Sequence, residues 1–352
     1  MHVLVTGNLG YVGPHVVRRL REAFPGAVLS GLDTGYFAHC LSSAALPATV
    51  PHHQHVADLR DFDPAILAGV DAVVHLAAIS NDPMGNRFAD VTRAINHDAG
   101  VRLATRAREA GVRRFVFASS CSMYGAAADD ARTEDSPLNP LTPYAQSKVS
   151  LEEALRGLAG QRFIVTSLRF ATACGLSDRL RLDLVLNDFV AAAVAHGKIT
   201  ILSDGTPWRP LIAVSDMARA IEWALGRDPG AGRFLAVNAG RDDWNFQVRD
   251  LAEAVAHEVP GAVVENAAGA QPDRRSYRVS FARFRSLARS HQPRATLPQV
   301  IREMAEGIRG LDLGEADFRR SRWTRLHALE ELRASGKLSA DLRWAPAEAA
   351  GA

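Results

Sequence analysis

Tyr144 and Lys148 are the residues of this sequence best suited to proton transfer. Residues four apart on a helix lie on the same face, one turn from each other. A free tyrosine has a pKa of about 10 and is a poor base near neutrality, but a neighbouring ammonium favours its phenolate. Ser120, in the serine-rich segment 119–125, would donate or relay a hydrogen bond to the same oxygen. The pattern indicates hydride chemistry on an alcohol, with an incidental surface pair as the alternative.

Three glycines at residues 7, 10 and 13 follow the first expected strand. Gly7 permits a tight turn, Gly10 lets the backbone approach a pyrophosphate, and Gly13 lets the next helix pack against the sheet. The N–H groups at that helix N-terminus would face two phosphates. Because a strand precedes the loop and a helix follows it, the segment predicts dinucleotide binding. A plain strand–helix turn is the alternative.

Two carboxylates follow later strands of the same pattern. Asp33 ends the second strand, where it would accept hydrogen bonds from both ribose hydroxyls and repel a 2′-phosphate. The expected cofactor is therefore NAD rather than NADP. A loop aspartate capping Thr34 is the alternative interpretation. Asp58, beside Leu59, holds a similar position, where it could meet the adenine amino group.

Short apolar runs alternate with helical patterns in the first half of the chain. Such alternation implies βαβ units and a parallel sheet. The expected fold is α/β, a Rossmann-type doubly wound parallel sheet with a smaller C-terminal lobe. Expected strands cover residues 3–5, 28–32, 72–76, 114–118 and 163–170. Expected helices cover residues 12–23, 90–110, 144–158, 216–225 and 245–259. The expected divisions are 1–174, 175–314 (mainly the lobe, with some segments returning to the sheet) and a helical tail, 315–352.

Composition excludes several classes of function. The net charge of +2, with 23% charged residues, gives no case for a nucleic-acid partner. No apolar run approaches the ~18 residues of a membrane span, and the N-terminus has no signal-peptide pattern. Cys40, Cys121 and Cys174 lack paired or metal-like spacing, which suits a reducing, cytoplasmic compartment. The histidines at 52, 53 and 55 lack carboxylate or thiolate partners, so no metal is expected.

Segments 6–13, 75–78, 119–125, 144–148 and 169–175 together resemble the extended short-chain dehydrogenase/reductases, and more narrowly their nucleotide-sugar epimerase/dehydratase branch. The resemblance covers roughly residues 1–290. It implies a tightly held NAD, a C-terminal lobe that clamps a nucleoside-diphosphate sugar, and a homodimer formed through helices near 90–110 and 144–158. Carried over by matching position, Ser120, Tyr144 and Lys148 are the catalytic triad and Asn96 organises the site. The implied cofactor contacts are Gly7, Leu9, Gly10, Tyr11, Val12, Gly13, Asp33, Asp58, Leu59, Leu76, Ala77, Ala78, Asn96, Tyr144 and Lys148.

The residues after Ser120 separate reactions within that branch. The 4,6-dehydratases usually carry Asp-Glu there and sugar-acid decarboxylases keep the glutamate, whereas this chain has Cys121 and Ser122. The resemblance then favours an epimerase acting at C4, which oxidises the sugar to a 4-keto intermediate and reduces it again. A 4-ketoreductase or a 4,6-dehydratase is the first alternative, and a non-catalytic NAD-binding sensor or scaffold is the second.

Contacts to the sugar nucleotide are expected from several scattered positions. Ser80, in the loop 80–83, faces the sugar unless the loop is an ordinary turn. Thr172 replaces an asparagine that relatives often use, and Arg209 matches an arginine directed at the diphosphate. For the arginines, a solvated surface position is the alternative. The full expected set is Ser80, Ser122, Thr172, Arg181, Asn187, Arg209 and Arg275. The arginines of the tail (319, 320, 322, 325 and 333) are expected on a solvated face, with Trp323 and Trp344 as anchors.

Overall fold

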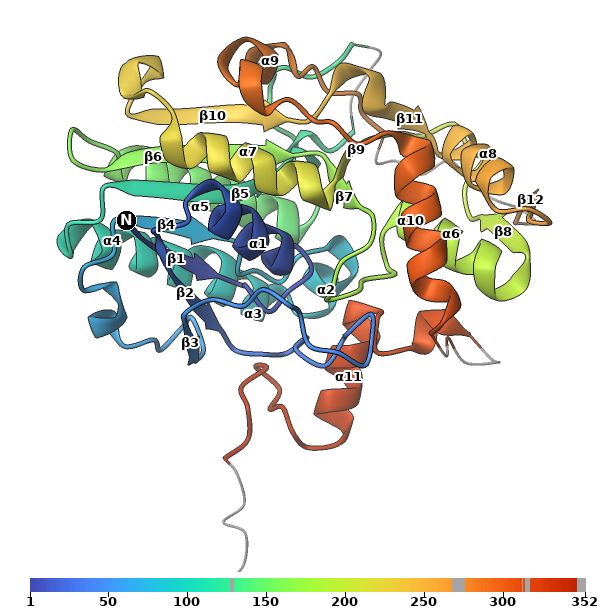
Figure 1. Ribbon diagram of the computed structural model, residues 1–352, viewed down its shortest axis with the longest axis horizontal. Coiled ribbons are helices and arrows are strands. Elements are labelled where there is room, and N and C mark those ends of the chain that lie inside the picture. The colour runs from blue at the N-terminus through green and yellow to red at the C-terminus, as the bar shows by residue number, and fades with distance from the viewer. Residues whose placement is uncertain (127–129, 268–275, 312, 314–316, 347–352) are drawn as a thin grey trace, which may run out of the picture.

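A parallel sheet of seven strands forms the centre of the molecule (Figure 1). The computed structural model describes residues 1–126, 130–267, 276–311, 313 and 317–346. The strand order is β10-β6-β5-β4-β1-β2-β3, and every neighbouring pair is parallel. The chain therefore forms the doubly wound α/β sheet that the sequence predicts. The strands are β1 (His2–Thr6), β2 (Val28–Asp33), β3 (His53–Val56), β4 (Ala72–His75), β5 (Arg114–Ser120), β6 (Ile164–Phe170) and β10 (Phe234–Ala239).

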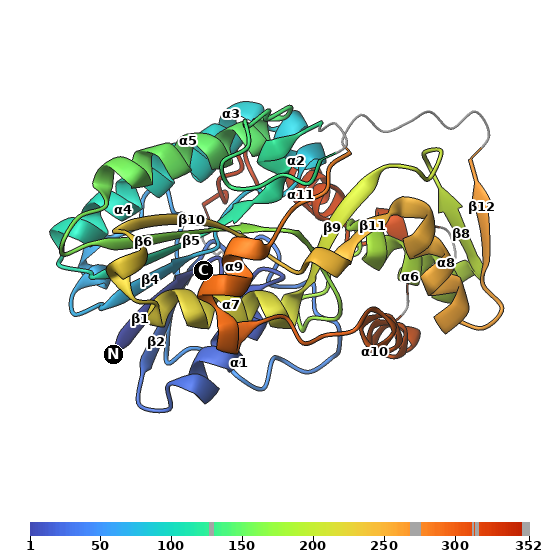
Figure 2. The ribbon, with the colours of Figure 1, turned by 90° about the horizontal axis from the view of Figure 1, so that it is seen from above.

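Helices cover both faces of this sheet, as Figure 2 shows. On one face lie α2 (Asp82–Arg87), α3 (Ala89–Arg93), α4 (Gly100–Glu109) and α5 (Pro143–Leu158); on the other lie α1 (Gly13–Ala23), α7 (Val214–Gly226) and α9 (Ala282–Leu287). The helix expected at 90–110 is interrupted by a π-helical turn, Ala94–Ala99. Since both faces are covered, central strands such as β4 and β6 are buried along their whole length.

The smaller lobe adds two short sheets to the right of the central sheet in Figure 2. One contains β7 (Thr172–Cys174), β9 (Trp208–Ala213) and β11 (Asn245–Gln247), and the other contains β8 (Lys198–Ile201) and β12 (Val263–Asn266). Three helices pack with them around a second apolar core: α6 (Val185–His196), α8 (Val248–Glu258) and α10 (Leu297–Arg309). The divisions at residues 174 and 314 stay a proposal.

Three sequence predictions differ from the structure. The helix expected from residue 245 begins only at Val248, because Gln247 and Asp250 form a capping box there and the three preceding residues pair as β11. The sequence indicates a strand end before Asp58 but does not indicate the bounds of β3, because its His53, Gln54 and His55 are polar residues at the sheet edge. Within the described part of the tail, 317–346, the helical residues are α11 (Arg325–Ala334) and the 3-10 turn Phe318–Arg320.

Short 3-10 turns complete the description: Pro64–Leu67, Cys121–Tyr124, Pro229–Ala231, Asp242–Trp244 and Arg289–His291. Within the described residues, no helix is long and apolar enough to cross a membrane. All three cysteines are free and buried.

Candidate active site

A cavity of about 950 Å³ opens at the carboxyl ends of the central strands and continues to the smaller lobe. In open parallel sheets ligands bind at these strand ends, where the strand order reverses. Gly7, Gly10 and Asp33 lie on its wall at one end, and Thr200 and Arg209 at the other. Its size falls within the range of small-molecule and cofactor sites, and it spans both parts of the molecule.

The glycine loop has the geometry that a dinucleotide requires. Gly7 has φ +73°, and a Cβ there would lie 2.5 Å from the backbone nitrogen of Ala77. A Cβ on Gly13 would lie 2.1 Å from the carbonyl oxygen of Asn8, so only glycine lets α1 start this close to the loop. Gly7 and Gly10 line the cavity while Gly13 supports the loop from behind. The residues present therefore fit a pyrophosphate at the N-terminus of α1.

Asp33 is held in place by its own loop. Its carboxylate accepts hydrogen bonds from the backbone N–H groups of Leu9 (2.9 Å) and Gly35 (2.7 Å). Burial raises the pKa of Asp33, and these two bonds oppose the rise. The carboxylate bonds the N–H of Gly35 rather than that of Thr34, and Asp33 lines the cavity. Leu9 thus fixes the acceptor that the sequence assigns to the ribose.

Ser120, Tyr144 and Lys148 meet on the cavity wall. Ser120 ends β5, and its hydroxyl hydrogen-bonds the phenol of Tyr144 in the first turn of α5. The Lys148 ammonium donates to the carbonyl of Ala118 (2.8 Å) and lies 5.6 Å from the centre of the Tyr144 ring. Thr142 caps α5 by accepting from the N–H of Ala145, which sets the start of this helix.

The electrostatics of this trio differ from the expectation. Burial raises the pKa of Tyr144 to about 12, although the Ser120 hydrogen bond opposes the rise. Burial also lowers the pKa of Lys148 to about 7. Desolvation is therefore the largest influence on the pKa of both groups. Near neutral pH, Lys148 can therefore be present both as the ammonium and as the neutral amine.

Asn96 lies behind the wall, in the π-helical turn. Its amide accepts from the N–H of Ile79 (2.8 Å) and donates to the Ile79 carbonyl (2.9 Å) and to the Ser147 hydroxyl (3.0 Å). It therefore ties the segment after β4 to α5. The extra residue of the π-turn aims Asn96 at both partners, which is a common use of such turns.

Five of the seven residues expected to bind the sugar nucleotide lie on the cavity wall. Ser80, Ser122, Thr172, Arg181 and Arg209 line the cavity. Arg181 donates to the Ser80 hydroxyl (2.9 Å) and to Asp183 (2.8 Å), so its guanidinium is fixed rather than solvated.

Asn187 is fully buried behind the cavity wall. It donates to the phenol oxygen of Tyr11 (3.1 Å) and the carbonyl of Arg181 (2.8 Å), and it accepts from the N–H of Gly175 (2.9 Å). Its placement therefore supports two wall residues. Arg275 lies outside the described residues.

Most of the remaining cofactor candidates lie on the cavity wall. Tyr11, Val12, Asp58, Leu59, Leu76, Ala77 and Ala78 line the cavity. Asp58 has an additional partner, Arg60, whose guanidinium contacts both of its oxygens. No group of three or more potential metal ligands occurs among the residues the structure describes.

Sequence reasoning missed several residues of the wall. Tyr36 and Phe37 follow Asp33, and Asp82 lies in the loop already suspected of facing the sugar. Tyr277 lies two residues after Arg275, in a segment that resembles the family's nucleotide-binding loop, but it was not itself assigned to the site. Arg325 was expected on a solvated face, which is wrong, because it is only 1% exposed and lies over the Phe37 ring at 4.5 Å.

The sheet, the glycine loop and the Ser-Tyr-Lys trio define a dinucleotide-dependent enzyme of the extended short-chain dehydrogenase/reductase class. A model of the NAD dependent epimerase/dehydratase family matches residues 3–240. This chain therefore belongs to the NAD-dependent epimerase/dehydratase family, and its cofactor is NAD.

Different relatives of this chain are named for different reactions. A UDP-glucose 4-epimerase of Streptomyces lividans is 30% identical over 285 residues, covering 73% of this chain and 82% of that protein. A dTDP-glucose 4,6-dehydratase of Streptomyces griseus is 30% identical over 247 residues, covering 68% and 74%. The solved structure of MoeE5 in complex with UDP-glucuronic acid and NAD is similar with a TM-score of 0.74 and 27% identity, covering 88% of this chain and 99% of that one.

Proposed function

We propose that this enzyme inverts a carbinol, at C4, of a nucleoside-diphosphate sugar. The observation that carries the proposal is the trio Ser120, Tyr144 and Lys148 on a wall where the next two residues are not carboxylates. Cys121 is fully buried, its thiol contacts the carbonyl of Arg169, and burial raises its pKa. Ser122 has a hydroxyl that can bind a sugar but cannot act as a carboxylic acid at neutral pH.

In the proposed reaction Tyr144 removes the proton from the sugar hydroxyl. Ser120 holds the reacting oxygen through its hydroxyl. Because burial raises the pKa of Tyr144 to about 12 and lowers that of Lys148 to about 7, formation of the phenolate would depend on a protonated Lys148 and on the positive nicotinamide ring of bound NAD. The chemistry that NAD supplies when bound is the reversible acceptance of a hydride from the same carbon. Rotation of the 4-keto sugar would present its other face, and Tyr144 would return the proton. Arg209, at the far end of the cavity, supports binding of the diphosphate.

The competing candidate is a 4,6-dehydratase, and it has one observation in its favour. Asp82 lines the cavity, accepts from the Thr142 hydroxyl (2.7 Å), and its charge acts on Tyr144. A carboxylate near the reacting centre could assist elimination of water. The similar dehydratase of Streptomyces griseus is consistent with that alternative.

The test incubates the NAD-loaded enzyme with UDP-, dTDP-, GDP- and CDP-hexoses in deuterated water, with the products followed by NMR. We expect one sugar nucleotide to give its C4 epimer without added cofactor and without deuterium at C5. A 4-keto-6-deoxy product, or deuterium at C5, would identify a dehydratase instead. Consumption of stoichiometric reduced cofactor would identify a 4-ketoreductase.

Tyr144→Phe is the decisive variant. General acid–base catalysis contributes about 10²–10⁴-fold to rate, so turnover should fall by at least about a hundredfold while NAD stays bound. Activity near the wild-type level would contradict the assignment. A cytoplasmic homodimer stays part of the proposal: three buried free thiols support a reducing compartment, and light scattering of the purified protein would test the dimer.

A further inference from the structure

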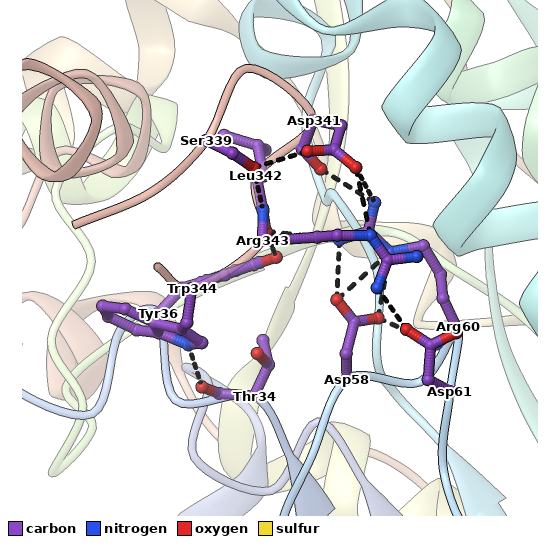
Figure 3. A network of polar contacts seen from close by, with 10 residues as sticks. All are labelled: Thr34, Tyr36, Asp58, Arg60, Asp61, Ser339, Asp341, Leu342, Arg343 and Trp344. Carbon is purple, nitrogen blue, oxygen red and sulfur yellow. Dashed lines mark hydrogen bonds and ion pairs between the residues drawn. The ribbon is translucent and has the colours of Figure 1, made fainter. Parts of the chain in front are cut away.

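Residues 338–344 of the C-terminal tail, here called the clasp, fold against the loops that follow β2 and β3 (Figure 3). The clasp is a closed turn in which Leu338 bridges Trp344 and the N–H of Ser339 bonds the carbonyl of Arg343 (2.9 Å). The indole of Trp344 donates to the carbonyl of Thr34 (2.7 Å). The phenol of Tyr36 donates to the carbonyl of Leu342.

Apolar contacts hold the clasp as firmly as the polar ones. Leu338 and Leu342 are buried in one cluster with Tyr36, Ile79 and Met84. The ring of Trp344 lies 5.9 Å from that of Tyr36. The clasp is therefore a built part of the body of the protein, although it lies far beyond the part of the chain that the family model matches.

Arg60 connects the clasp to the cavity. On one side its guanidinium donates to both carboxylate oxygens of Asp58, at 2.6 to 3.1 Å. On the other side it donates to the clasp carbonyls of Asp341 (2.8 Å) and Leu342 (3.2 Å). Four acceptors surround one buried guanidinium, so the position of Asp58 depends on the clasp.

Further ion pairs close the same network. Arg343 pairs with Asp61 in the loop after β3 and with Asp341 within the clasp (3.0 Å). Burial opposes ionisation of Asp58, but its hydrogen bonds to Arg60 and the Arg60 charge hold its pKa below the usual value. Asp58 is thus a fixed, ionised acceptor.

The clasp stands behind the wall rather than in the cavity. Thr34, Tyr36, Asp58 and Leu59 line the cavity, while no residue of the clasp does. Asp33, the expected ribose acceptor, lies on the same wall, so this end of the cavity is suited to the adenosine half of the cofactor. A carboxylate at Asp58 is an acceptor for an exocyclic amine.

We propose that the clasp positions Asp58, through Arg60, to hold the adenine amino group of NAD, and that it thereby slows release of the cofactor. Arg60, Arg343 and Trp344 are positioning residues in this arrangement. The proposal concerns the cofactor alone, so it stands or fails independently of which sugar is converted.

Deleting the clasp is a poor test, because removal of Leu338 and Leu342 would open an apolar cluster. The better variant is Arg343→Ala combined with Trp344→Ala, since both side chains are partly exposed, at 43% and 42%, and lie outside the buried cluster. The conservative partner is Arg343→Lys, which keeps the charge opposite Asp61. The control is Arg302→Ala on α10, which removes an exposed ion pair with Glu258 in the other lobe.

The measurement exchanges unlabelled NAD in the holoenzyme for excess isotope-labelled NAD, and separately for deamino-NAD, which lacks the adenine amino group. A net hydrogen bond corresponds to roughly tenfold in equilibrium. We expect the double variant to release NAD about tenfold faster and to lose most of the wild-type preference for NAD over deamino-NAD. Arg343→Lys and Arg302→Ala should behave like the wild type.

Two results would overturn the proposal. One is wild-type release of NAD from the double variant. The other is an equal loss of affinity for NAD and deamino-NAD, because a merely structural tail would weaken both dinucleotides alike.

Discussion

Glu152 and Arg169 form a buried ion pair beneath the active site, and Glu152→Gln should destabilise the protein strongly. Both side chains are 4% exposed, and their closest nitrogen–oxygen distance is 2.5 Å. Ser167 also donates to Glu152 (2.7 Å). Glutamine keeps the volume but leaves the guanidinium without its counter-charge. Breaking a buried pair in this way costs about 3–5 kcal/mol, and the retained amide oxygen places the expected loss near about 3 kcal/mol.

Urea unfolding followed by tryptophan fluorescence would measure this loss. The control is Glu109→Gln, which breaks the exposed pair with Arg106 and should cost about 0–1 kcal/mol. Glu152→Leu combined with Arg169→Met removes both charges and should cost less than Glu152→Gln alone. A Glu152→Gln protein as stable as Glu109→Gln would refute the reasoning.

Further predictions concern the cofactor loop and acid stability. Gly13→Ala places a Cβ against the Asn8 backbone and should cost about 1–3 kcal/mol and release NAD, whereas Gly26→Ala, with open space around its Cβ, should be neutral in urea unfolding. Asp33→Asn removes the charge that repels a 2′-phosphate, so the ratio of NAD to NADP affinity, measured by calorimetry, should fall about tenfold; the exposed cap variant Asp63→Asn should leave that ratio unchanged. Burial, then the Lys148 charge, lower the pKa of His75 to about 3. As the pH falls, the imidazole is therefore protonated in the unfolded chain before it is protonated in the folded protein. The stability that neutral His75 provides is complete above its ordinary pKa and is lost as the pH falls toward 3. Between pH 7 and 5 the wild type should lose about 2 kcal/mol more than His75→Asn; equal losses would contradict the shift.

The central strands could be predicted because buried strands consist mostly of apolar residues. β4 and β6 are covered on both faces, so nearly all of their residues are apolar or small, with His75 and Arg169 as the exceptions. β3 has one exposed edge and polar side chains, so it lacks that signal. The π-turn at residues 94–99 was invisible for another reason: one extra residue shifts the helix phase without changing which side chains are apolar.

The meeting of Ser120, Tyr144 and Lys148 on the cavity wall could be predicted because these residues lie next to a strand end and a helix start. Ser120 closes β5, and Tyr144 opens α5 beside it. Tyr277 and Arg325 reach the same cavity by the path of the chain through the smaller lobe and the tail, which no local pattern encodes. Asn187 was assigned to the substrate, yet the structure buries it, because position near a motif does not reveal which way a side chain points.

Arg325 shows why an arginine-rich tail need not form a solvated face. Arg325 stacks over Phe37, donates to the carbonyl of Arg179 (3.3 Å), and has burial lowering its pKa. Arginine tolerates this better than lysine, since its delocalised charge is weakly hydrated and its plane stacks on aromatic rings. The start of α11 thus forms the same wall as the loop after β2, and the clasp contacts that loop at Thr34 and Tyr36. One wall of the cofactor cavity is therefore built by residues of the first strands together with residues of the tail.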